Sequence, residues 1–277
     1  MDRYAVIGNP VEHSRSPFIH EQFALATGQG LSYSRVLCPL DGFEQAVRRF
    51  AAAGARGCSV TVPFKFEACR LCATLTERAQ LAGAVNMLRF DADGWFGDNT
   101  DGIGLVRDIE GNAGLRLAGC RVLLVGAGGA AAGALGPLLL ARPAAVVVSN
   151  RTPAKAHSLV AAHLALAQRA GVGLTATPLD GCGAAFDLVI NASASSLQRA
   201  GVPVQTDVLR PGTLALDMMY GPPARAFLDW AAAHGARGRD GLGMLVEQAA
   251  EAFSLWRGVR PDTAPVLAAL RRQMSLR

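Results

Sequence analysis

Long apolar runs are missing from this sequence, and so is any stripe of basic residues. The most apolar stretch, Ala130 to Ala141, is broken by Pro137 and stops at Arg142, well short of the roughly 20 residues that a membrane span needs. The formal net charge of +5 comes from scattered arginines, without the interleaved aromatics of a nucleic-acid surface. We therefore expect no membrane and no nucleic-acid partner, and an anionic small molecule as the ligand.

Signals for export and for metal binding are missing as well. Asp2, Arg3 and Asn9 interrupt the apolar start of the chain, so we expect no secretory signal and a cytoplasmic location. The six cysteines are then expected to be free thiols. Cys69 and Cys72 form a C-x-x-C pair, but no second pair and no nearby histidine complete a zinc site. We therefore predict no metal.

Apolar strands alternate with helical segments along the 277 residues, which are enough for two domains. Strands are expected at residues 4–7, 33–37, 59–62, 122–125, 145–149, 174–176, 188–190 and 214–216. A strand pair is expected over 85–96, around the turn at 91–94. The glycine-rich segment Gly111 to Gly119 marks the joint between the domains. This alternation predicts an α/β fold with a parallel, doubly wound sheet.

A glycine-rich loop follows the strand at 122–125 and opens an alanine-rich helix. The loop consists of Gly126, Ala127, Gly128, Gly129, Ala130 and Ala131. Because such a turn has few side chains, its backbone N–H groups reach a pyrophosphate that the helix N-terminus then stabilises. The alternative is an ordinary glycine-rich turn, since the sixth position carries Ala131 in place of glycine. The flanking strand and helix favour a dinucleotide site.

The end of the next strand distinguishes between two dinucleotides. Proteins that bind NAD(H) usually carry an acid there, which accepts hydrogen bonds from the ribose. Here Asn150 is followed by Arg151, Thr152 and Lys155, and two cations with hydroxyl and amide donors suit a dianionic 2′-phosphate. The alternative is a solvated helix start, but the helix dipole disfavours cations at that end. We therefore predict NADP(H) over NAD(H).

Polar residues also gather where the predicted strands of the first hundred residues end. Each has an ordinary structural interpretation when taken alone. Lys65 stands out because it is one of only two lysines among 27 basic residues, and the other is Lys155 of the predicted phosphate site. An arginine-rich chain that keeps lysine at two positions indicates a need for a compact, titratable ammonium group there.

Several sequence blocks with this chemistry occur in a fixed order along the chain. They are Gly8 to Pro10, His13 to Pro17, Val60 to Lys65, Gly83 to Asn86, Asp98 to Gly102, Gly126 to Ala131, Asn150 to Thr152, Asp217 to Tyr220 and Gly241 to Ala250. With these blocks the chain resembles the shikimate dehydrogenase family, within the shikimate/quinate dehydrogenase superfamily, along essentially its whole length.

The resemblance implies an oxidoreductase that reversibly reduces 3-dehydroshikimate to shikimate with NADPH, a step of aromatic amino-acid biosynthesis through chorismate. It implies Lys65 and Asp101 as the catalytic pair, which delivers a proton to the alkoxide and stabilises it. The substrate-binding positions that it implies are Ser14, Ser16, Thr61, Lys65, Asn86, Asp101, Tyr220 and Gln248. To the cofactor positions Gly126 to Ala130, Asn150 to Thr152 and Lys155 it adds Glu77, Met218 and Gly241.

The resemblance also implies that the C-terminal helices return to the first domain. Residues 1–101 and 243–277 are then the substrate-binding and catalytic domain, and residues 102–242 are the Rossmann-type NADP-binding domain. A monomer and a homodimer are both compatible with the sequence.

Five residues depart from the family pattern: Glu21, Ser59, Met87, Ser193 and Ser196. Because Ser59 and Met87 adjoin substrate positions, a paralogous dehydrogenase for quinate or an aminoshikimate is an alternative. A non-catalytic NADP(H)-binding regulatory protein is an alternative of another class. The presence of Lys65 and Asp101 argues against it.

Overall fold

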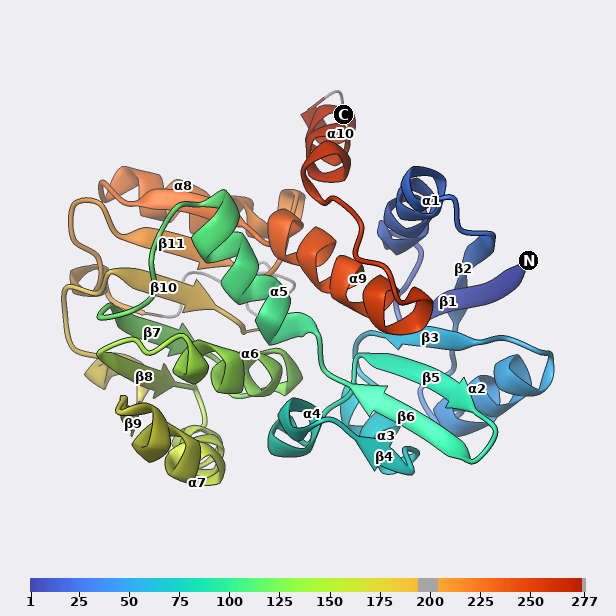
Figure 1. The fold of residues 1–277 in the computed structure, drawn as a ribbon. Coiled ribbons are helices and arrows are strands. Elements are labelled where there is room, and N and C mark those ends of the chain that lie inside the picture. Colours follow the sequence, from blue (N-terminus) through green and yellow to red (C-terminus); the bar gives the residue numbers. More distant parts are fainter. Residues whose placement is uncertain (194–203, 276–277) are drawn as a thin grey trace. The chain divides into compact units, whose positions relative to one another are not determined.

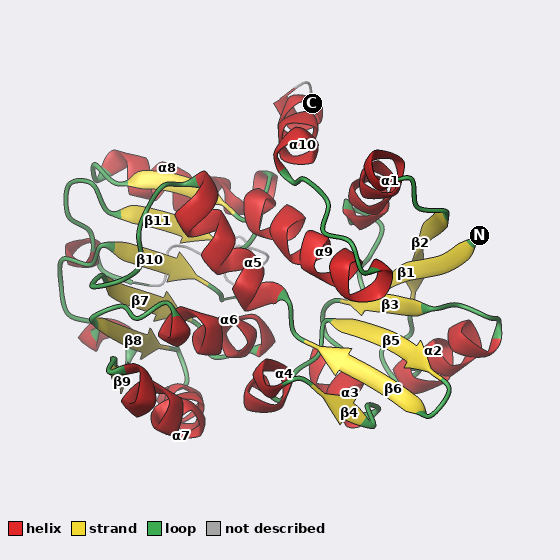
Figure 2. Ribbon diagram, viewed as in Figure 1, coloured by secondary structure: helices red, strands yellow, loops and turns green. Residues whose placement is uncertain are grey.

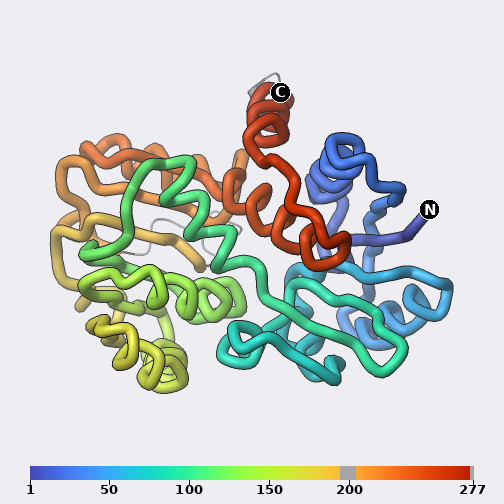
Figure 3. The backbone as a smooth tube through the Cα atoms, viewed as in Figure 1, coloured from blue at the N-terminus to red at the C-terminus, as the bar shows by residue number. Residues whose placement is uncertain are grey.

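The computed structural model describes residues 1–193 and 204–275, and it divides into two compact units. Unit 1 comprises Met1–Gly104 and Leu245–Arg277, and unit 2 comprises Leu105–Met244. The chain leaves unit 1 within helix α5 (Asp101–Arg107) and returns within helix α9 (Leu242–Arg257), a path that Figure 3 traces. The predicted fold class is confirmed: each unit is an α/β domain with one β-sheet, and the C-terminal helices belong to unit 1 (Figure 1).

Unit 1 is built on a mixed six-stranded sheet in the order β2-β1-β3-β5-β6-β4 (Figure 2). Its strands are β1 (Asp2–Gly8), β2 (Leu31–Leu37), β3 (Gly57–Val60), β4 (Thr74–Leu75), β5 (Met87–Asp91) and β6 (Gly94–Asp98). Strands β1, β2 and β3 are parallel, whereas β5 pairs antiparallel with both β3 and β6. The predicted strand pair is therefore confirmed as the β5–β6 hairpin. Because β5 is reversed, its first residues lie beside the last residues of β3 and β6.

Helices bury both faces of the unit 1 sheet, because side chains alternate along each strand. The helices are α1 (Ser16–Thr27), α2 (Phe43–Ala52), α3 (Lys65–Arg70), α4 (Glu77–Ala82), α9 and α10 (Ala264–Ser275). On one face, Ile7 of β1 belongs to the same apolar cluster as Phe43 of α2 and Ala68 of α3. On the other face, the ring of Tyr4 packs at a tilt against Trp256 of α9, with 4.7 Å between the ring centroids. The amphipathic pattern of the strands thus places α9 against the sheet.

Unit 2 contains a fully parallel six-stranded sheet in the order β12-β11-β10-β7-β8-β9. The strands are β7 (Arg121–Val125), β8 (Ala145–Ser149), β9 (Gly173–Thr177), β10 (Leu188–Asn191), β11 (Leu214–Asp217) and β12 (Arg237–Asp240). The helices α6 (Gly129–Leu140), α7 (Pro153–Ala170) and α8 (Arg225–Ala233) connect strands. Numbered within the unit, the strand order is that of a doubly wound dinucleotide-binding fold, whose direction reverses between β7 and β10.

The apolar composition of the unit 2 strands reflects their position in a covered parallel sheet. Every residue of β10 and β11 is buried, as expected for strands with helices on both faces. Within residues 1–193 and 204–275 there is no helix both long enough and apolar enough to cross a bilayer.

Candidate active site and dinucleotide site

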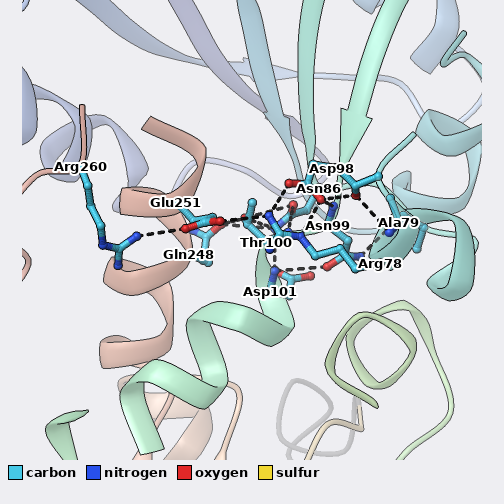
Figure 4. Close-up of polar contacts among 12 residues, drawn as sticks. Arg78, Ala79, Asn86, Asp98, Asn99, Thr100, Asp101, Gln248, Glu251 and Arg260 are labelled. Carbon is cyan, nitrogen blue, oxygen red and sulfur yellow. Dashed lines mark hydrogen bonds and ion pairs between the residues drawn. The ribbon is translucent and has the colours of Figure 1, made fainter. Parts of the chain in front are cut away.

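In unit 1, polar side chains converge where β3 and β6 end and β5 begins. Asn86, directly before β5, links both neighbours through its backbone: Val60 N–H donates to its carbonyl at 2.7 Å, and its own N–H donates to the Asp98 carbonyl at 3.0 Å. Asp98 ends β6, and Asp101 opens α5. The reversal of β5 therefore brings Asn86 beside the 98–101 turn (Figure 4).

Lys65 and Asp101 form an ion pair in this region. Their side chains are 15% and 8% exposed, so the pair is shielded from most of the solvent and its attraction is screened less than that of a surface pair. Lys65 is the first residue of α3, and its carbonyl accepts a hydrogen bond from Val85 N–H at 2.9 Å. The structure thus brings together the two residues predicted to be catalytic.

Asn86 holds the second oxygen of Asp101. The Asn86 Oδ1 atom accepts from Thr100 N–H at 2.8 Å. Because a backbone N–H can only donate, this bond fixes which end of the amide is oxygen. The Nδ2 atom then points to Asp101 Oδ1 at 2.8 Å, and to Gln248 Oε1 at 3.3 Å. Asp101 therefore accepts hydrogen bonds at both oxygens, from Lys65 at one and from Asn86 at the other, which fixes the orientation of its side chain.

Gln248 approaches this cluster from α9. Its Oε1 atom accepts from the Thr100 hydroxyl at 3.2 Å, and its Nε2 atom donates to the Leu245 carbonyl at 2.9 Å. The approach depends on Gly104, because a Cβ atom there would lie 2.6 Å from the Gln248 backbone nitrogen. Gln248 is 9% exposed, and its amide is thus oriented by Asn86, by Thr100 of the turn before α5, and by the Leu245 carbonyl of its own helix.

The other predicted substrate residues of unit 1 follow β1 and β3: Ser14 and Thr61 lie in loops, and Ser16 is the first residue of α1. The Ser14 hydroxyl donates to Ser16 Oγ at 3.2 Å and accepts from Ser16 N–H at 3.3 Å. Arg35 of β2 donates to the Ser14 carbonyl from Nε at 3.0 Å and from NH2 at 2.6 Å, an anchor that the sequence pattern did not reveal. Thr61 packs over Gly8, where a Cβ atom would lie 2.2 Å from the Thr61 methyl group.

In unit 2, the glycine-rich loop follows β7 with the geometry that the sequence predicts for it. Gly126 has a φ of +120°, and a Cβ atom there would lie 2.8 Å from the Ala192 carbonyl oxygen. Gly128 occupies the N-cap position of α6. Ala131, at the sixth position of the loop, is fully buried, so a methyl group fits where the helix packs closely on the sheet.

The segment after β8 presents its cations to solvent. Arg151, Thr152 and Lys155 are exposed at the start of α7. Asn150 Nδ2 donates to the Thr152 carbonyl at 3.0 Å, and this carbonyl also accepts from Lys155 N–H at 3.0 Å. The turn is therefore fixed through its backbone, while the cationic ends reach outward.

Two further cofactor positions of unit 2 lie side by side. A Cβ atom on Gly241 would lie 2.2 Å from the Met218 carbonyl oxygen, so only glycine allows this approach. The turn after β11 is braced by Asp217, whose carboxylate accepts from Asn191 Nδ2 at 3.0 Å and from Met219 N–H at 2.8 Å. This brace was not predicted from the sequence.

Tyr220 belongs to unit 2 and Glu77 to unit 1. Their predicted contacts, of Tyr220 with the substrate and of Glu77 with the cofactor, stay predictions. Among the residues that depart from the family pattern, Ser59 Oγ accepts from the Tyr33 hydroxyl at 2.7 Å, and Ser193 donates to Asn191. Met87 is fully buried, and Ser196 lies outside the described residues.

The cysteines are all free. Burial raises the pKa of the Cys72 thiol to about 12, and it also raises the pKa of Cys58 and Cys69. The thiolate is the reactive and metal-binding form, so these buried groups are poor nucleophiles. No cluster of three or more potential metal ligands occurs within the described ranges, 1–193 and 204–275.

Comparison with known proteins connects both sites to one family. Three family models match the chain: the shikimate dehydrogenase substrate binding domain at residues 6–88, shikimate/quinate 5-dehydrogenase at residues 108–210, and the shikimate 5′-dehydrogenase C-terminal domain at residues 241–271. A shikimate dehydrogenase (NADP(+)) from Methylibium petroleiphilum is 64% identical over 276 residues, which cover 98% of this chain and 94% of the relative.

Solved structures agree with these matches. Shikimate 5-dehydrogenase from Thermus thermophilus, in complex with NADP(H) and shikimate, is 34% identical, with a TM-score of 0.83 and coverage of 98% of this chain and 99% of that chain. An Ael1 enzyme from Pseudomonas putida is 46% identical, with a TM-score of 0.87 and coverage of 98% of each chain. The chain thus belongs to the shikimate dehydrogenase family.

Proposed function

We propose that this protein catalyses the reversible reduction of 3-dehydroshikimate to shikimate with NADPH. The observation that carries the proposal is the shielded Lys65–Asp101 ion pair, held from its far side by Asn86. An ammonium group fixed in this way is a proton donor suited to a ketone that is being reduced. The relatives named for NADP-dependent shikimate oxidation and reduction support the same reaction.

The bound nicotinamide supplies the hydride to the carbonyl carbon of the substrate. As negative charge develops on the carbonyl oxygen, the Lys65 ammonium group stabilises it and transfers a proton to it. Asp101 orients the Lys65 amino group, and Asn86 holds Asp101 in place. In the direction of oxidation, the same lysine accepts the proton of the shikimate hydroxyl.

The loops around the ion pair are assigned to the rest of the substrate. Ser14 and Ser16 would hold the carboxylate, because hydroxyl groups donate well to an anion. We assign the ring oxygens of the substrate to the amide and hydroxyl groups of Thr61, Asn86 and Gln248. Residues 1–101 and 243–277 thereby form the substrate-binding and catalytic domain.

Residues 102–242 form the NADP-binding domain. Gly126 to Ala130 would hold the pyrophosphate, because the absence of a Cβ on Gly126 and the N-terminus of α6 suit an anion. Arg151 and Lys155, with Asn150 and Thr152, hold the 2′-phosphate. Met218 and Gly241 would face the nicotinamide side.

The test follows nicotinamide absorbance with shikimate and with quinate, each with NADP⁺ and with NAD⁺. We expect the highest kcat/KM for shikimate with NADP⁺. A higher kcat/KM for quinate would assign the protein to the paralogous dehydrogenases. NADP(H) binding without turnover of either compound would instead assign it to the non-catalytic regulatory proteins.

A further inference from the structure

Arg78 makes three hydrogen bonds to carboxylates that come from two different elements of unit 1. Its Nε and NH2 atoms donate to Asp98 Oδ1 at 2.8 Å and to Asp98 Oδ2 at 2.5 Å. The same NH2 atom donates to Glu251 Oε1 at 3.1 Å. Arg78 lies on α4, Asp98 ends β6 and Glu251 lies on α9, so one guanidinium group joins all three elements (Figure 4).

Asp98 begins the turn that carries Asp101. Its carboxylate is fully buried, and it also accepts from the Thr76 hydroxyl at 2.5 Å and from Asn99 N–H at 2.7 Å. A buried carboxylate depends on its charged partner, because desolvation is costly when that partner is lost. Arg78 therefore determines where Asp98 lies, and Asp98 fixes the first peptide of the turn.

The position of Asp98 affects Asp101 through the hydrogen bonds of Asn99, which lies between them in the turn. The Asn99 side chain donates to the Ala84 carbonyl at 3.0 Å and accepts from Asp101 N–H at 3.2 Å. A displacement of Asp98 would move Asn99, and with it the backbone N–H of Asp101.

The hydrogen bond from Arg78 to Glu251, which we call its second arm, connects Arg78 to α9, the helix that carries Gln248. Arg260 donates to Glu251 Oε2 at 3.0 Å and to Glu247 Oε2 at 2.9 Å, one helical turn apart on α9. Glu247 precedes Gln248 in the sequence. The arrangement Arg78–Glu251–Arg260–Glu247 thus anchors α9 on the side next to the Asn86 and Asp101 cluster.

We propose that Arg78 is a positioning residue for the reduction, which fixes the placement of Asp101 relative to Gln248 through Asp98 and Glu251. This inference rests on the proposed function of the Lys65–Asp101 pair. Its physical basis is the planar fork of arginine, which makes two parallel bonds to one carboxylate and still donates to a second. Lysine carries the same charge, but it cannot form this fork.

The test compares Arg78→Met and Arg78→Lys with Arg89→Met. Arg89 is the matched control, because it pairs with Asp91 in a similar fork at 2.8 and 3.0 Å, at the turn end of the β5–β6 hairpin. We measure kcat and the KM values for shikimate and NADP⁺ at a temperature where thermal unfolding curves show every variant folded.

For Arg78→Met we expect kcat to fall by about tenfold to about 100-fold, which is the cost of misplacing a reacting group by about an ångström. The shikimate KM should rise, and the NADP⁺ KM should stay within about twofold, because the predicted dinucleotide residues lie mainly in unit 2. Arg78→Lys should recover only part of kcat, and Arg89→Met should match the unsubstituted protein.

Unchanged kcat in folded Arg78→Met would overturn the proposal. So would full recovery by Arg78→Lys, or equal losses in Arg89→Met. Glu251→Gln keeps the Asp98 fork and removes the negative charge that Glu251 shares between Arg78 and Arg260, so it serves if Arg78→Met does not fold. An unchanged shikimate KM and kcat there would remove the α9 part of the proposal. Full turnover by Lys65→Ala would refute the catalytic pair itself, whatever the Arg78 variants do.

Discussion

The two predicted sites of this molecule are held in place by different means. In unit 1, the polar side chains of Lys65, Asn86 and Asp101 are shielded and bonded to one another. In unit 2, Arg151 and Lys155 are exposed, and the loops that carry them are fixed through the backbone. We infer that the loss of one member disturbs the whole cluster in unit 1, whereas the cationic positions of unit 2 respond separately. Four predictions test this contrast, beginning with the largest expected effect.

The catalytic pair gives the strongest test. We expect Lys65→Ala and Asp101→Asn each to lower kcat by about 100-fold to about 10,000-fold, the usual range for a lost general acid or base. Steady-state rates with shikimate and NADP⁺ measure the loss, and circular dichroism checks that the fold is preserved. The double variant should lose little more than either single variant, because the two residues act as a unit. Full turnover by either variant would refute the assignment.

The glycine-rich loop should respond to substitution at one glycine and tolerate it at another. Gly126→Ala combines a φ of +120° with a Cβ position 2.8 Å from the Ala192 carbonyl oxygen, and we expect a destabilisation of about 1–3 kcal/mol. Gly128→Ala is the control, since its φ is −92° and nothing lies within 4 Å of its Cβ position. Chemical denaturation without ligand measures both. Equal stability of the two variants would show that the loop relaxes freely.

The exposed cations of unit 2, Arg151 and Lys155, should affect only the preference for NADP⁺ over NAD⁺. We expect Arg151→Ala to weaken NADP⁺ binding by about tenfold to about 100-fold, in line with about 1.5–3 kcal/mol for a hydrogen bond to a charged group. NAD⁺ binding and kcat should stay the same, because Arg151 is proposed to bind the 2′-phosphate, which NAD⁺ lacks. Titration of both dinucleotides measures the ratio. An unchanged NADP⁺/NAD⁺ preference would transfer the role to Lys155 or Asn150.

His20 provides the smallest and most local test. Burial lowers the pKa of His20 from 6.5 to about 3, and the ring stacks on Tyr33 at 4.2 Å between centroids. The unfolded chain therefore binds a proton below pH 6.5 that the folded chain does not bind until about pH 3. Stability is consequently lost as the pH falls through this window, by up to about 1.4 kcal/mol per pH unit from this one group.

Denaturation curves measured between pH 7 and pH 4 give the slope of unfolding free energy against pH. His20→Phe should reduce it, because phenylalanine keeps the aromatic packing without the titratable ring. The exposed His157 gives the control variant His157→Phe, which should leave the slope unchanged. An identical slope in all three proteins would mean that other groups dominate the acid sensitivity.

How well each site could be predicted depends on how close its residues lie in the sequence. Asn150, Arg151 and Thr152 are adjacent in sequence, so their chemistry could be read directly. The β5–β6 hairpin was predictable for the same reason, because its strands are joined by a short turn. The dinucleotide fold could be derived from the alternation of strands and helices around the loop at Gly126.

The supporting contacts of unit 1 were not predictable in this way. Arg78 and Glu251 are separated by 173 positions, and nothing in their local sequence distinguishes an anchoring ion pair from a solvated one. Nothing in the local sequence around Gly104 indicates that its backbone lies close to Gln248. Long-range pairing of this kind depends on the packing of α9 against the sheet, which a single sequence does not specify.

The discontinuity of unit 1 has a consequence for the order in which the protein forms during synthesis. Residues 105–244 leave the ribosome between the two segments of unit 1. The parallel sheet of unit 2 is complete in sequence before α9 is made, so it can fold first, as domains generally do in order of emergence. The face of the unit 1 sheet around Tyr4 stays uncovered until α9, which carries Trp256, has been synthesised. A nascent chain stalled before α9 should therefore expose this aromatic surface to chaperones.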